Sequence, residues 1–370
     1  MRSGAQGWHT LAYVVVMTYI GYIRRDPVRR RSPKMKRFLN AVLALGIAAC
    51  MRTGGSTMPA PTGEPQAFLF SYFMRNGEDG VHLAYSRDGI TWLPLNGGRS
   101  VITPAVTGSG RGWQEWNTTA ALMRDPSILR GPDGTFHLVW TVAWTDHAIG
   151  VAHSRDLIHW SEQMRVPVME HEPDALNTWA PDLFYDDATK EFVIVWASSI
   201  PGRFPATDSV AQKTSRGRAD HRLYYVTTKD FKTYSHAALL YDGGFCAIDG
   251  TIAKRGDTYY LVMKDETFFP PARNIRVASA KHATGPYGPA SPSFTAHDTE
   301  GPSVLHSGDY WYVYYDEYTR GHYGAVRTKD FEHWELFTDS LKTPRGIRHG
   351  SAFLAPESVL RGLMALDSIR

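Results

Sequence analysis

The chain has 370 residues, of which 43% are hydrophobic and 12% aromatic, so it can bury a large core. Its formal charge is +3, but residues 1–49 hold nine Lys or Arg and one acid, which leaves 31 basic against 36 acidic side chains in residues 50–370. This mildly acidic body has no basic stripe with interleaved aromatic residues, so we expect no nucleic acid as a partner.

The basic segment 1–49 has the pattern of an export leader. A short basic region begins at Met35 and is followed by an apolar run and by small residues before Cys50, as in a secretory signal peptide. With cysteine at the cleavage position, residues 35–49 resemble a bacterial lipoprotein signal. We therefore expect export, a lipid on Cys50 as the only membrane anchor, and a place on the bacterial membrane, the cell surface or in the periplasm. Met35 would then be the true start, and residues 1–34 would be an over-extension of the start site or an unexplained extension. The alternative for residues 35–49 is an ordinary signal peptide or a shallow helix.

Residues 50–66 are rich in Gly, Pro, Ser and Thr, which predicts a flexible tether. The chain has two cysteines. If Cys50 carries a lipid, Cys246 has no partner for a disulfide, and we expect it to be a buried small hydrophobic residue.

An apolar strand, a charged bend and a closing aromatic residue recur five times along the chain. The closing aromatics are 68, 74, 53 and 47 residues apart, a period that suits four-stranded sheets arranged radially. The five units are residues 83–92, 151–160, 224–234, 277–287 and 324–334. The pattern predicts an all-β fold, a five-bladed β-propeller over residues 67–356, with a C-terminal tail at 357–370.

A short step with an ionisable residue opens the first strand of most hairpins. The five steps are residues 124–128, 179–183, 247–251, 300–304 and 348–352. The fifth step has no hairpin after it, and the first repeat has no step before it. We therefore expect the C-terminal strand 349–354 to complete the blade that begins at 67–73, which closes the ring and removes exposed sheet edges.

Equivalent strand starts in a propeller converge on its axis, and this would place five ionisable side chains around one cavity. They are Asp125, Asp182, Asp249, Glu300 and His349. Carboxylates gathered in a partly dry pocket cannot all keep ordinary pKa values, so one becomes an acid while others stay ionised. Glycoside hydrolysis needs this division. A single carboxylate at a strand start usually caps local amides, but three at equivalent places favour a functional site.

The five steps, taken in order, resemble glycoside hydrolase family 43, five-bladed propellers that act on arabinosides, xylosides and related sugars. The motifs are Arg-Asp-Pro-Ser-Ile from residue 124, Trp-Ala-Pro-Asp from 179, Ile-Asp-Gly from 248, Glu-Gly-Pro-Ser from 300 and Arg-His-Gly from 348. The resemblance covers about residues 66–355. It implies that Asp125 is the general base, that Glu300 is the general acid, and that Asp249 orients the acid and raises its pKa. It also implies inversion, for which a carboxyl separation of roughly 6.5–9.5 Å between Asp125 and Glu300 is expected.

Other residues near the hub have roles that the sequence leaves open. By the resemblance, His349 matches a histidine that in some members faces an axial water or calcium ion, so a structural Ca²⁺ at the axis is one alternative and a plain hydrogen-bonding role is the other; no cofactor is required. Asp182 either lines the pocket or bonds backbone amides. Sugar pockets combine aromatic platforms with polar forks, and the candidates for substrate contact here are Trp144, Trp179, Asp182, Arg276, Tyr323, Arg348 and His349.

We therefore expect a monomeric, inverting and exo-acting glycosidase for α-L-arabinofuranosides, β-xylosides or galactofuranosides of polysaccharides. Insertions at residues 103–121 and 201–220 would shape the pocket rim. One alternative is a retaining fructosidase-like hydrolase, although its Asn-Asp-Pro-Asn and Glu-Cys motifs are absent from the sequence. The other is a surface glycan-binding propeller without turnover.

Overall fold

The computed structural model describes residues 64–106, 121–214 and 217–368. The predicted leader, the lipid site at Cys50 and most of the predicted tether lie outside these residues and stay predictions. None of the helices in the described ranges is long and apolar enough to cross a membrane.

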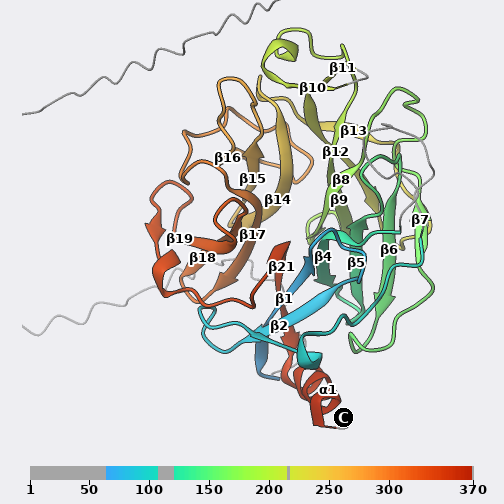
Figure 1. The fold of residues 1–370 in the computed structure, drawn as a ribbon, viewed down its shortest axis with the longest axis vertical. Coiled ribbons are helices and arrows are strands. Elements are labelled where there is room, and N and C mark those ends of the chain that lie inside the picture. The colour runs from blue at the N-terminus through green and yellow to red at the C-terminus, as the bar shows by residue number, and fades with distance from the viewer. Residues whose placement is uncertain (1–63, 107–120, 215–216, 369–370) are drawn as a thin grey trace, which may run out of the picture. The chain divides into compact units, whose positions relative to one another are not determined.

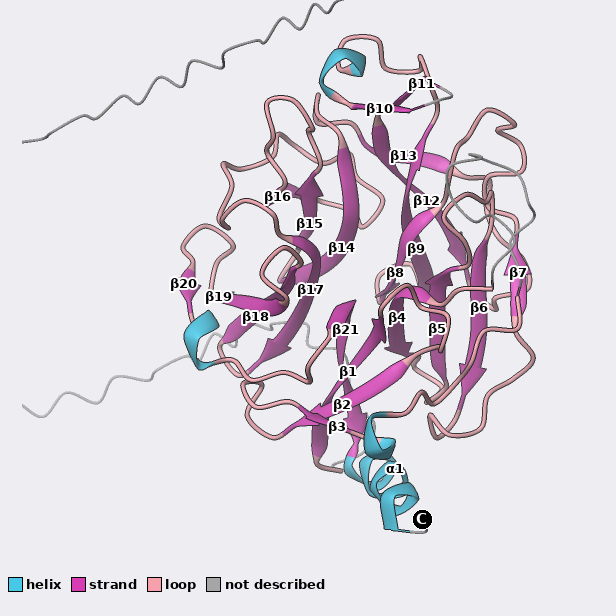
Figure 2. Cartoon of the chain, viewed as in Figure 1, coloured by secondary structure: helices cyan, strands magenta, loops and turns pink. Residues whose placement is uncertain are grey.

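Five antiparallel sheets surround a common axis, and the predicted five-bladed β-propeller is confirmed (Figures 1 and 2). With the inner strand first, the sheets are β21 (Ile347–Pro356), β1 (Gln66–Met74), β2 (His82–Ser86) and β3 (Leu93–Pro94); β4 (Arg124–Arg130), β5 (Phe136–Thr141), β6 (Ile149–Ser154) and β7 (Met164–Val166); β8 (Trp179–Asp186), β9 (Glu191–Ser199), β12 (His221–Thr228) and β13 (Ala238–Tyr241); β14 (Ala247–Arg255), β15 (Thr258–Asp265) and β16 (Asn274–Ala280); and β17 (Glu300–Ser307), β18 (Tyr310–Glu317), β19 (His322–Thr328) and β20 (Glu335–Leu336). Each inner strand contacts the inner strands of both neighbouring sheets, in the circular order β21, β4, β8, β14, β17.

The first sheet combines strands from both ends of the propeller. β21 pairs antiparallel with β1, and the paired residues run from Gln66 opposite Pro356 to Met74 opposite Ile347. The same sheet continues outward to β2 and β3.

Two features differ from the sequence-based expectation. The sheet that contains β14 has three strands rather than four. Residues 357–370 were expected to be a tail, but Glu357–Ser368 form helix α1. The helix is amphipathic. Leu360 and Leu363, on its apolar face, are fully buried in the core that also contains Phe353. Burial of an apolar helix stripe against the first two blades explains why the segment folds.

The repeated charged bend has one physical cause in four of the blades. In each, an aspartate carboxylate accepts hydrogen bonds from the backbone N–H groups two and three residues later, as in an Asx-turn. These aspartates are Asp88, Asp156, Asp230 and Asp330. The residue after each aspartate has a positive φ, and in three blades it is a large, buried side chain, Leu157, Phe231 or Phe331. Burial of this side chain between blades offsets the backbone strain.

Insertion 201–220 lies on the end of the propeller where the inner strands begin, because it joins the end of β9 to the start of β12. It contains a 3-10 turn at Asp208–Val210 and the small hairpin β10 (Gln212–Thr214) and β11 (Gly217–Ala219). The backbone N–H groups of Phe268 and Phe269, in the β15–β16 connection, both donate to the carbonyl of Val210. The insertion is thus joined to the neighbouring blade at the same end.

Candidate active site

Every inner strand begins with a β-bulge, and the bulges define which residues are equivalent. The pairing register shifts by one residue between Arg124 and Ser127 on β4, and the same shift occurs at the start of the other four inner strands. The second residue of the bulge has a positive φ on four of the strands, at Asp125, Ala180, Asp249 and Gly301. A bulge turns a side chain away from the sheet, and here it directs the side chain at each strand start.

The register places the five predicted hub residues on three levels. Asp125, Asp249 and His349 share the second position of the bulge. Glu300 is one residue earlier, in the first position, and Asp182 is two residues later, in the fourth. The prediction that all five occupy equivalent positions is therefore wrong, because a step of similar sequence can be read in more than one register.

The fourth position forms a polar belt that joins neighbouring blades. On three strands its hydroxyl accepts a hydrogen bond from the backbone N–H of the next blade: Ser127 from Leu183 at 3.3 Å, Ser351 from Ile128 at 3.0 Å, and Ser303 from Ala352 at 2.8 Å. Asp182 belongs to this belt, and Ser127 donates to its carboxylate at 2.6 Å. Burial raises the pKa of Asp182. Asp182 therefore has a structural contact in this belt and also lines the pocket described next.

The second position brings two of the predicted catalytic carboxylates together. Nδ1 of His349 lies 3.5 Å from Oδ1 of Asp125 and 3.9 Å from Oδ2 of Asp249. All three side chains line one narrow pocket, which Asp182 also lines. Thr141 donates to the other oxygen of Asp125 at 2.9 Å. The imidazole of His349 thus lies between Asp125 and Asp249, and the three side chains come from three different blades.

Gly301 allows Glu300 and His349 to come close. Its φ is +60°, and a Cβ atom at this position would lie 2.4 Å from the His349 ring. Its backbone N–H donates to Oδ2 of Asp249 at 3.0 Å. A residue with a side chain would therefore be strained and would displace the histidine.

A buried lysine and a half-buried arginine hold the carboxylate of Glu300. Nζ of Lys264 lies 3.1 Å from Oε2, and Nη2 of Arg348 lies 3.0 Å from Oε1. Arg348 also donates through Nε to Asp316 at 2.7 Å. The sequence analysis placed Arg348 among the substrate-binding residues, and in the structure it bridges two carboxylates.

The distribution of pKa shifts differs from the prediction. Burial raises the pKa of Glu300, but the positive charges of Lys264 and Arg348 outweigh this effect, so that the net shift is downward. Burial raises the pKa of Asp249 to about 6, even though His349 and Lys264 favour its ionised form. The expectation that Asp249 raises the pKa of Glu300 above its usual range is wrong for the free site, where the proton is held more readily by Asp249.

Two half-buried tryptophans lie beside the carboxylates. Trp179 occupies the same bulge position on β8 that Glu300 occupies on β17. Its indole N–H donates to the carbonyl of Trp144 at 2.7 Å, and the two rings meet edge to face at 5.8 Å. The guanidinium of Arg124 lies 4.0 Å from the ring of Trp144. Partly exposed aromatic rings near polar groups are suited to a sugar, so both tryptophans stay candidates for substrate contact.

Two other predicted contact residues are placed elsewhere. Tyr323 is only 2% exposed and packs edge to face on Phe70 in the core, so its assignment as a substrate-binding residue is corrected. Arg276 is on β16, two strands away from β14, and it pairs with Asp265 at 3.0 Å. That ion pair, rather than a hub carboxylate, is the contact that the structure gives Arg276.

Cys246 directly precedes strand β14 and is buried. Cys246 is 1% exposed, and burial raises the pKa of its thiol, as expected for an inert core residue. Among the described residues, no group of three or more His, Cys, Asp or Glu side chains is arranged to hold a metal ion. The structural Ca²⁺ at the axis, which His349 would face through water, stays a prediction, and we derive no step through an ion.

The sequence analysis missed Lys264, Asp316 and Thr141. All three contact a predicted catalytic residue or its partner, and all three lie at the ends of second strands. The signal for Lys264 was available, because it is a charged residue that directly follows the apolar and aromatic run Tyr259–Met263.

Comparisons with known proteins agree with this architecture. A family model for family-43-related domains, described as a probable glycosyl hydrolase domain, matches residues 64–355. An α-L-arabinofuranosidase of Bifidobacterium longum is 24% identical over 259 residues, which are 64% of this chain; the chain spans only 23% of that protein's length.

Solved structures with a similar fold include an α-L-arabinofuranosidase from Lactobacillus brevis, which is 19% identical with a TM-score of 0.46 over 58% of this chain and 72% of that one. A thermostable family-43 glycoside hydrolase is 13% identical with a TM-score of 0.47 over 68% and 82% of the two chains. An exo-β-1,3-galactanase from Phanerochaete chrysosporium is 14% identical with a TM-score of 0.46 over 64% and 54%. Because the family model covers most of the sequence, the resemblance is confirmed, and the chain belongs to the family-43-related glycosyl hydrolase domains.

Proposed function

We propose that the protein is an inverting, exo-acting glycosidase for α-L-arabinofuranosides or related pentosides and galactofuranosides. The observation that carries the proposal is the geometry of the bulged strand starts. They bring Asp125 and Asp249 to one histidine, His349, and they place Glu300 directly before Gly301, whose backbone N–H donates to Asp249. The named relative from Bifidobacterium supports an arabinofuranoside as the first sugar to test.

Asp125 is the proposed general base. Thr141 fixes one carboxylate oxygen at 2.9 Å, and the other faces His349 at 3.5 Å. These contacts hold the carboxylate in one orientation, from which it can remove a proton from a water molecule that attacks the anomeric carbon.

Glu300 is the proposed general acid, and it must gain a proton before it can act. In the free site the cations favour its ionised form, while Asp249 has a pKa of about 6. A sugar bound against Glu300 removes water from this carboxylate, and desolvation favours the protonated form. Asp249 is the adjacent carboxyl group with a raised pKa, so we propose that it supplies the proton to Glu300.

The test is turnover of natural glycosides, whose leaving groups need protonation, by wild type, Asp125→Asn and Glu300→Gln. We expect each variant to lose about 10²- to 10⁴-fold in turnover with the fold intact, as is typical when a general acid or base is removed. Asp309→Asn is a matched control, because Asp309 is an 82% exposed turn residue. Near-wild-type rates from either hub variant would remove this mechanism.

A glycan-binding propeller without turnover is the second candidate. One observation favours it: both oxygens of Glu300 are paired with cations, which suits an ionised carboxylate that only binds. Sugar binding by wild type and Glu300→Gln alike, with no product from either, would support this function instead.

A further inference from the structure

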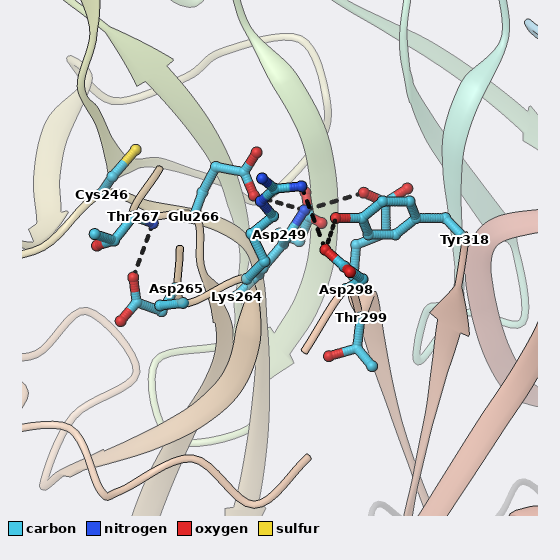
Figure 3. Close-up of polar contacts among 12 residues, drawn as sticks. Cys246, Asp249, Lys264, Asp265, Glu266, Thr267, Asp298, Thr299 and Tyr318 are labelled. Atoms are coloured by element: carbon cyan, nitrogen blue, oxygen red, sulfur yellow. Dashed lines mark hydrogen bonds and ion pairs between the residues drawn. The ribbon is translucent and has the colours of Figure 1, made fainter. Parts of the chain in front are cut away.

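A buried lysine connects the proposed acid to a second carboxylate. Lys264 is the last residue but one of strand β15, and its side chain is 2% exposed. Its ammonium group reaches across a blade boundary to Glu300 at 3.1 Å and also lies 2.6 Å from Oε2 of Glu266. The ring of Tyr318 covers it, with the nitrogen 4.9 Å from the ring centroid. Figure 3 shows Lys264 together with Glu266 and Tyr318.

The two carboxylates compete for one charge. Glu266 is closer to the ammonium group than Glu300 is, and its side chain is 25% exposed. In a buried site the attraction between opposite charges depends strongly on distance. Any change that strengthens one of these pairs therefore weakens the hold of Lys264 on the other carboxylate.

We propose that Lys264 is a positioning residue for Glu300, and that Glu266 sets how firmly Lys264 holds it. The inference deepens the proposed function, because it takes Glu300 to be the acid. Glu266 directly follows strand β15 and belongs to none of the bulged strand starts. The pair of Lys264 and Glu266 is therefore separate from the carboxylates of the bulges. Movement of Lys264 toward Glu266 would release Glu300 to take up a proton when a sugar binds.

Several other groups face this pair and must stay constant in a test. The charged or titratable side chains that act on Lys264 or Glu300 from the surrounding elements are Asp249, Arg348, His349, Asp316, Arg124, His221, Tyr318 and Tyr323. None of them is altered in the variants below. Differences between variants therefore report the Lys264 and Glu266 charges.

The two partners predict shifts of opposite sign. Lys264→Met removes a cation that favours the ionised forms of both Glu300 and Asp249. The alkaline limb of the pH profile of kcat/KM, which reports the proton that these two carboxyl groups hold in the free enzyme, should therefore move up by about one to three pH units. Glu266→Gln leaves the ammonium group to Glu300 alone, so the same limb should move down. Lys264→Arg keeps the charge and should restore most of the wild-type profile. A purely structural role would lower activity in both variants without opposite shifts.

The matched control is Lys254→Met, which removes a mostly buried lysine from the other end of the same hairpin, where it pairs with Asp187. Its pH profile should stay that of wild type. Shifts of the same sign in Lys264→Met and Glu266→Gln, or no shift in either, would overturn the inference while leaving the glycosidase proposal intact. Circular dichroism checks folding, and Glu266→Gln is the milder variant if Lys264→Met does not fold.

A second readout does not depend on turnover. The ¹³C carboxyl signal of Glu300, assigned by its loss in Glu300→Gln, should titrate at higher pH in Lys264→Met and at lower pH in Glu266→Gln. If wild type hydrolyses no glycoside but these titrations shift as stated, the proposed function fails and the positioning role stands. If the signal titrates identically in all three proteins, the positioning role fails.

Discussion

Asp249→Asn should make the protein more stable while making it a poor catalyst. Burial raises the pKa of this carboxyl from 3.8 to about 6. A shift of about two units corresponds to about 3 kcal/mol, which the folded protein loses when Asp249 ionises. Asparagine keeps an oxygen that can accept the N–H of Gly301 but carries no charge, so it removes this cost.

The pH dependence follows from the direction of the shift. Because the folded pKa lies above the unfolded one, the stability is fully present below about pH 4, is lost between about pH 4 and pH 6, and stays lost above that. The free energy of unfolding of Asp249→Asn should therefore exceed that of wild type by up to about 3 kcal/mol at pH 7 and match it near pH 4. Denaturant melts at pH 4, 5, 6 and 7 measure the difference.

Asp156→Asn is the matched control with the opposite sign. Burial raises the pKa of Asp156, but hydrogen bonds from the His159 side chain, from backbone amides and from Ser154 together outweigh burial and lower the pKa to about 2. The ionised form therefore stabilises the fold, and the variant should be less stable at pH 7. The reasoning would be refuted if Asp249→Asn were the less stable protein at pH 7, or if its advantage did not grow between pH 4 and pH 6.

Other outcomes follow from the site and the core. Gly301→Ala should lower both the melting temperature and kcat/KM, because a Cβ atom 2.4 Å from the His349 ring must displace it; wild-type values for both would contradict the packing. Leu363→Ala should cost about 2–5 kcal/mol in chemical unfolding, since Leu363 of helix α1 is fully buried, and a loss below 0.5 kcal/mol would show that the helix is dispensable. Glu300→Gln should be milder on aryl glycosides than on natural ones, because good leaving groups need little protonation; equal losses on both would contradict its role as the acid.

The fold could be predicted from sequence because its signals are local and repeated. Each charged bend uses one aspartate to bind amides two and three residues ahead, so the bend can be recognised without knowing what packs on it. The helix at the C-terminus was missed because its two buried leucines reveal a stripe only once the blade surface they cover is known. The absent fourth strand beside β16 also depends on the surroundings rather than on local pattern.

The site residues were found, but their relative levels were not. Aligning the steps by their ionisable residues placed Glu300 and Asp182 beside Asp125, whereas aligning them by the third bulge residue gives the observed register. That residue is Pro126, Pro181, Gly250, Pro302 or Gly350 on the five inner strands. The pKa shift of Glu300 could not be predicted, because Lys264 reaches it from another blade, 36 residues away in the chain.

The most direct test of the account is the anomeric configuration of the first sugar released by the wild-type enzyme. A panel of aryl α-L-arabinofuranosides, β-D-xylosides and β-D-galactofuranosides would be followed by proton NMR from the first minutes of reaction. If Asp125 activates a water molecule on the face of the sugar opposite Glu300, the inverted anomer should appear first and then mutarotate. The retained anomer as the first product would contradict the roles given to Asp125 and Glu300.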